Sequence, residues 1–127
     1  VASGAIAATL DLITVLDSDI YGISILGNYA TVRHCRVIDT DGIGIAFGAN
    51  FGIGEFNTVF SSGATAIRLQ TSSGASRIIG CEASDGTTGI IEAGTGSTNA
   101  LIHLNTANVS GPNNGLATVE VAHNVVY

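Results

Sequence analysis

The sequence contains few of the residues that build an ordinary soluble helical domain. Tryptophan and methionine are absent, proline occurs once, and charged residues make up only 11% of the 127 positions. A helical domain presents a charged, solvated face on each helix, and this composition excludes that class. Because proline is almost missing, the turns must be formed mainly by Gly and Asn.

Basic side chains, long apolar runs and cysteines are scarce as well. Four Lys and Arg against ten Asp and Glu give a formal net charge of −6, which argues against nucleic acid, whose phosphates are bound by basic groups. No apolar run reaches the roughly 18 residues of a membrane-spanning helix, so membrane insertion is not expected. The start, VASGAIAATL, lacks the basic region of a signal peptide and is interpreted as a strand or as a cut through a longer protein. Two cysteines are too few for a disulfide framework.

Small or β-branched apolar residues, glycine and hydroxyl side chains dominate what remains. Hydrophobic residues make up 46% of the chain, and there are 17 glycines. Val, Ile and Thr favour strands, while Gly, Asn and Ser favour turns. The composition therefore predicts short strands joined by tight turns.

One phrase recurs along the chain. VLDSDIYGISI at 15–25 returns 22 residues later as VIDTDGIGIAF at 37–47. Within this phrase, a small residue followed by an aliphatic one continues along the chain at a nearly constant step. The pairs are Gly22-Ile23, Gly44-Ile45, Ala66-Ile67, Gly89-Ile90 and Gly115-Leu116.

A second column of residues recurs independently at the same step. Its members are Cys35, Asn57, Cys81, Asn105 and Asn124. Three positions earlier stand Val32, Gly54, Ile78, Ile102 and Val121. Two positions later stand Val37, Val59, Ala83, Ala107 and Val126. The agreement between the two columns indicates a repeat of about 22 residues.

A unit of this length that is made of strands and turns predicts a β-solenoid. Helical repeats need an apolar period of 3.6 residues and leucine-rich repeats need a regular Leu ladder, and both patterns are missing. We expect an all-β fold of about five to six coils, forming a single domain over residues 1–127. Each coil would pair in parallel with the next at about 4.8 Å, so that like residues stack on like.

Stacking makes several contacts predictable. Two inner columns should form the core, namely Ile23, Ile45, Ile67 and Ile90, and beside them Ile25, Phe47 and Leu69. The Asn/Cys column should be an inward ladder whose amides hydrogen-bond from coil to coil. Cys35 and Cys81 would lie two coils apart, roughly 9.6 Å, which exceeds the reach of a disulfide. We expect both to be free buried thiols.

Two charged positions also lead to specific expectations. Arg33 and Glu55 occupy equivalent outward positions on adjacent coils and should form an exposed ion pair that supports the register. Glu92 falls on the inward phase after Ile90, where a carboxylate would be unusual. A bulge that turns Ile91 inward is therefore expected there.

The recurring pattern GI-x-I, turn, [VI]-x-x-[NC]-x-[VA], seen in 22–37, 44–59, 66–83 and 89–107, resembles a known family. It is similar to the right-handed parallel β-helices of the pectate-lyase-like superfamily, over residues 10–127. Low charge and many Gly, Ser, Thr and Asn residues make it most similar to bacteriophage tailspike and tail-appendage domains. The resemblance implies a location on a virion surface or outside cells, with cell-surface polysaccharide as a partner. The Arg and Lys residues that lyases of this superfamily place over acidic calcium sites have no counterpart here.

Carboxylates also fall into columns. One column holds Asp17, Asp39, Ser61 and Asp85, and another holds Asp19 and Asp41. Three interpretations are open: turn residues that cap their own backbone, a calcium site, or an acid/base pair for glycoside cleavage. In the last case the candidate catalytic residues are Asp17, Asp39 and Asp41. The histidines are scattered over three coils, so no metal site is assigned to them, and no cofactor is expected.

The third turn of each coil varies in length, and insertions in solenoids cluster on a face that often binds. Tyr29, Asn50 and Phe51 stand there as candidate glycan-binding residues. The leading hypothesis is a structural and receptor-binding β-helix, and the alternatives are a polysaccharide-degrading enzyme and a structural filament subunit. Because no capping helix is visible for the open ends, a homo-oligomer is expected, a trimer first and an end-to-end filament second.

Overall fold

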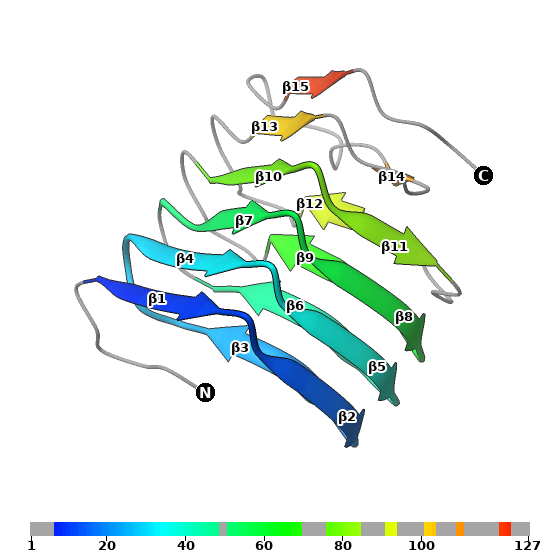
Figure 1. The fold of residues 1–127 in the computed structure, drawn as a ribbon. Coiled ribbons are helices and arrows are strands. Elements are labelled where there is room, and N and C mark those ends of the chain that lie inside the picture. Colours follow the sequence, from blue (N-terminus) through cyan, green and yellow to red (C-terminus); the bar gives the residue numbers. More distant parts are fainter. Residues whose placement is uncertain are drawn as a thin grey trace.

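The chain forms a parallel β-solenoid. The computed structural model describes residues 7–48, 51–69 and 76–84, together with the backbone of four short later strands at 91–93, 101–103, 109–110 and 120–122. All regular structure in these residues is β, and each coil passes in turn through three sheets (Figure 1). The all-β class predicted from composition is confirmed.

Each complete coil contributes one strand to each sheet. The first coil holds β1 (Ala8–Asp11), β2 (Thr14–Ser18) and β3 (Tyr21–Ile25). The second holds β4 (Ala30–Arg33), β5 (Arg36–Thr40) and β6 (Ile43–Phe47), and the third holds β7 (Ile53–Glu55), β8 (Thr58–Ser62) and β9 (Ile67–Leu69). The later strands are β10 (Arg77–Ile79), β11 (Glu82–Ser84), β12 (Ile91–Ala93), β13 (Leu101–His103), β14 (Val109–Ser110) and β15 (Glu120–Ala122).

The strand order within the sheets follows the coil order. The sheets run β1-β4-β7-β10-β13-β15, β2-β5-β8-β11 and β3-β6-β9-β12-β14, and every pairing is parallel. Ala8 pairs with Ala30, and Val15 pairs with Val37, so the register shift is 22 residues. The predicted stacking of coils is confirmed over the three coils that are described in full. A total of five to six coils stays a prediction, although β10, β13 and β15 extend the first sheet in the same order.

The predicted inner columns are the core. Ile23, Ile45 and Ile67 pair in sequence, and so do Ile25, Phe47 and Leu69. All six side chains are buried. The register of the first sheet likewise stacks Val32, Gly54, Ile78, Ile102 and Val121, as the sequence pattern predicts.

One predicted member of the core column is wrong. Ile91 rather than Ile90 pairs with Ile67, and Glu92 pairs with Arg68 on the neighbouring strand. The step from Ala66-Ile67 to Gly89-Ile90 is 23 residues, so the strict column drifts by one position there. The bulge expected at Glu92 is thus confirmed in the backbone register.

The corners of the coil are made by left-handed backbone. Eight non-glycine residues have φ between 50° and 60°, a conformation that costs an ordinary L-residue about 1–2 kcal/mol. They fall into columns: Leu12, His34 and Phe56, followed by Gly80; Asp17, Asp39 and Ser61; and Tyr29 and Phe51. Because the same corner recurs in each coil, packing of the adjoining strands must impose it.

The recurring glycine of the repeated phrase has a packing reason. A Cβ atom on Gly44 would stand 2.4 Å from Val59 Cγ1 and 2.5 Å from the Ala66 carbonyl oxygen. Gly22 meets the equivalent obstacle, with Val37 Cγ1 at 2.4 Å. Glycine therefore lets the third sheet approach the valine column of the second sheet.

Asn57 is the centre of the polar ladder. Its Oδ1 accepts a hydrogen bond from the Cys35 backbone N–H at 3.0 Å, and its Nδ2 donates to the Val32 carbonyl at 2.8 Å. Its backbone N–H lies 3.5 Å from Cys81 Sγ. The side chain thus joins the second, third and fourth coils, as predicted. Asn105 and Asn124, its predicted counterparts, lie outside the described residues.

The two cysteines are free and buried, which confirms the prediction that they cannot form a disulfide. Burial raises the pKa of the Cys81 thiol to about 11, and the nearby Glu55 charge acts in the same direction, while hydrogen bonds from Asn57 oppose it. A thiol with such a pKa stays protonated at neutral pH and is a poor nucleophile.

Replacing Asn57 with Ala tests the ladder. The variant leaves the buried Cys35 N–H and Val32 carbonyl without their partner, and we expect a loss of about 1–3 kcal/mol in the free energy of unfolding. Urea denaturation followed by circular dichroism measures it. Thr14→Ala, an exposed change on β2, should stay within about 0.5 kcal/mol. Equal stability of the two variants would contradict the ladder.

The Cys81 pKa makes stability depend on pH. In the unfolded chain the thiol ionises near 9.0, and in the fold near about 11. Because the unfolded state loses its proton first, the stability present below pH 9 is lost as the pH rises toward 11, by about 2–3 kcal/mol. Urea melts of the wild type and Cys81→Ala should therefore diverge from pH 8 to pH 11. A constant difference would show that the thiol is not shielded.

Candidate functional site

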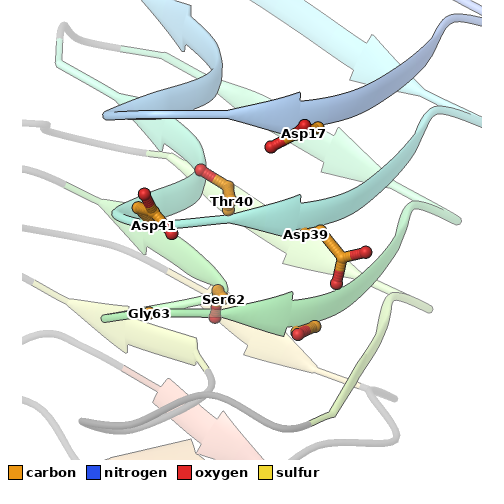
Figure 2. A pocket seen from close by; sticks show the side chains of 7 residues that line it. Asp17, Asp39, Thr40, Asp41, Ser62 and Gly63 are labelled. Atoms are coloured by element: carbon orange, nitrogen blue, oxygen red, sulfur yellow. The ribbon is translucent and has the colours of Figure 1, made fainter.

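The predicted carboxylates line one open cavity of about 340 Å³. Asp17, Asp39 and Ser61 occupy the same position in β2, β5 and β8, and Asp41 follows the end of β5. The structure thus brings Asp17, Asp39 and Asp41 to the same surface, over three successive coils (Figure 2). Thr40, Ser62 and Gly63 complete the lining.

The local backbone favours aspartate at this corner. Asp17 has a φ of 53° and Asp39 a φ of 54°, and short polar side chains are among the few that tolerate this conformation. Both side chains are exposed. The geometry therefore agrees with the interpretation that Asp17 and Asp39 are corner residues.

The cavity lacks several parts of an acid/base machine. Its lining contains no His, Lys or Arg. Within the described ranges, the carboxylates of Asp17, Asp39 and Asp41 form no ion pair. Figure 2 shows Asp39 and Asp41 on opposite sides of Thr40. The arrangement offers several acceptors to a polyhydroxylated ligand, but no oriented proton donor.

A column of hydroxyls beneath the cavity was not recognised from the sequence. Ser18, Thr40 and Ser62 pair in register, and each carries a buried hydroxyl oxygen without a hydrogen-bond partner. Thr40 and Ser62 are each only 2% exposed. The signal in the sequence is a Ser or Thr directly after each member of the acidic corner column. Because the oxygens are inaccessible, they do not reach a ligand in the cavity.

The cation interpretation gains no support. Across the described part of the chain, no group of three or more His, Cys, Asp and Glu side chains is placed to hold a metal ion. Calcium requires six to eight oxygen ligands, and the carboxylates of the cavity do not converge in this way.

The candidate glycan-binding aromatics form a stacked pair. Tyr29 and Phe51 lie in the turns after β3 and β6, with ring centroids 4.7 Å apart and planes 1° from parallel. Their exposures are 55% and 42%. Asn50, the third residue of this candidate site, lies outside the described residues.

A second surface cluster corrects a predicted ion pair. Arg33 does pair between coils, but with Asp11 on the preceding coil rather than Glu55 on the following one, and its Nε donates to Asp11 Oδ2 at 3.0 Å. His34 Nδ1 lies 3.1 Å from Asp11 Oδ1, and the His34 ring stacks on Phe56. The His34 contact, followed by Arg33, lowers the pKa of the Asp11 carboxyl. The cluster is solvated and fastens the first two coils together at the surface.

Comparison of the chain with protein-family models, with curated proteins and with solved structures gave no match. The solenoid is therefore established by its own strand pairing, and the resemblance to pectate-lyase-like β-helices gains no support from these comparisons. No helix in the described residues is both long and apolar enough to cross a membrane.

Proposed function

We propose that this chain is a structural, carbohydrate-binding segment of a pectate-lyase-like, right-handed β-helix, of the kind found in tailspikes and tail appendages. In this proposal it lies on a virion surface or outside cells and contributes to host attachment through cell-surface polysaccharide. The observation that carries the binding function is the exposed stack of Tyr29 on Phe51. The stacked core supplies a rigid support for it.

The stack is suited to sugar rings for a geometric reason. The two rings are parallel and separated by nearly one strand spacing, so their faces point along the solenoid. Phe51 covers one face of Tyr29. The register that pairs Ala8 with Ala30 places Ala7, a small side chain, beside the other face. The electron-rich face of Tyr29 can thus receive the C–H groups of a sugar ring.

The pair is also fixed before a ligand arrives. Each ring contacts the other, and each residue lies in a corner that the adjoining strands impose. A preordered ring loses less side-chain freedom on binding than a mobile one, which favours affinity.

Removing these rings tests the proposal. We expect Tyr29→Ala to weaken glycan binding about tenfold, as the loss of one aromatic contact of about 1.4 kcal/mol implies, and Phe51→Ala to weaken it less. A glycan array identifies a ligand for the wild type, and calorimetry then measures Kd for each variant.

Phe56→Ala is the matched control, because Phe56 is also an exposed aromatic with left-handed backbone, at a different corner. Its affinity should equal that of the wild type. Equal losses from Tyr29→Ala and Phe56→Ala, or a wild type that binds no glycan, would contradict the proposal.

A second candidate function is polysaccharide cleavage, favoured by the gathering of Asp17, Asp39 and Asp41 around one cavity. In this candidate, one carboxyl group protonates the glycosidic oxygen and another acts as base or nucleophile. An extended glycan chain would lie across the coils, in contact with carboxylates of successive strands.

Asp17→Asn and Asp39→Asn test this candidate without disturbing the corners, since Asn also tolerates left-handed backbone. If the cavity is catalytic, release of reducing ends from polysaccharide should fall at least about a hundredfold in one of the variants. Asp19→Asn, which does not line the cavity, should keep full activity. A wild type that binds a glycan array but releases no product would eliminate cleavage and leave binding intact.

A further inference from the structure

The outer face of the sheet β2–β5–β8–β11 carries an apolar column. Leu16, Ile38 and Phe60 pair in register on its strands. Leu16 is 64% exposed, while Ile38 and Phe60 are half-buried. On the adjoining corner, Leu12 and Phe56 are also exposed. Contiguous apolar surface of this kind marks an interaction site.

A column of polar residues runs beside the apolar one. Its members, in coil order, are Thr14, Arg36, Thr58 and Glu82. The exposed Arg36 and Glu82 therefore lie one coil on either side of Thr58. They are separated by two strand spacings, roughly 9.6 Å, and within the described residues neither forms an ion pair. The Arg36 guanidinium instead lies 5.8 Å from the centre of the Phe60 ring.

We propose that this face binds a second copy of the chain across a two-fold axis that runs along β8. Such an axis keeps the strand direction and reverses the order of the coils. Arg36 then faces Glu82 of the second copy, and Glu82 faces Arg36 of the second copy. Phe60 lies at the axis and meets its own counterpart. The surface is thus complementary to itself, as a two-fold interface requires.

The charges select this axis over the alternatives. An axis along β5 would improve the match between Leu16 and Phe60 but would oppose two Arg36 side chains, and facing like charges are unfavourable. A trimer with parallel coils, expected from the sequence, keeps each residue at the level of its own coil. Arg36 would then remain two levels from every Glu82. The Arg36–Glu82 contact therefore distinguishes a two-fold dimer from a parallel trimer.

Charge reversal tests the interface on the full 127-residue chain. Light scattering after size exclusion should give the mass of a dimer for the wild type. Arg36→Glu and Glu82→Arg, each placing like charges together at two symmetric contacts, should raise the dimer Kd at least about tenfold. The double variant R36E/E82R exchanges the charges, restores both contacts and should recover the dimer.

Arg77→Glu is the matched control, because Arg77 is an exposed arginine on β10, in a different sheet. It makes the same change in net charge and should leave the mass unchanged. Circular dichroism verifies that each variant is folded. A monomeric or trimeric wild type, a control as disruptive as Arg36→Glu, or a double variant that remains dissociated would each overturn the proposal.

Discussion

The fold depends on one constraint, which is that each coil pairs in register with the coil before it. Parallel pairing at the strand spacing places Ile45 between Ile23 and Ile67, and this continuity forms the core. The same constraint fixes the corners and the close approach at Gly44. A single change of register would move every side chain of a strand to the opposite face. The core and the surface columns are therefore two results of the same pairing.

In-register pairing also means that surface chemistry occurs in lines. Asp17 and Asp39 form an acidic line, and Tyr29 and Phe51 form an aromatic one. A linear polymer with a regular repeat can contact such a line at several points, whereas a compact small molecule can contact it at one. This geometry is the reason that a polysaccharide fits the proposed function better than a small metabolite does.

The sequence predicted contacts wherever the residue type and the spacing were sufficient. The core columns, the Asn57 ladder and the free thiols follow from a 22-residue step and the alternation of strands. Predictions failed where the step changed or where a side chain had a choice of partner. The 23-residue step placed Ile90 where Ile91 belongs, and Arg33 extended toward Asp11 instead of Glu55. Surface arginines have several reachable carboxylates, so their partner is decided by rotamers that no periodicity encodes.

The recurrence of the corner columns has a consequence for how such a chain can change in length. A gain or loss of one whole coil would leave the neighbouring coils with equivalent partners, because Asp17, Asp39 and Ser61 make interchangeable corners. A gain of one residue inside a strand would instead invert its inner and outer side chains. Relatives of this protein should thus differ by entire turns of the solenoid or by loop insertions, and seldom by single residues within strands.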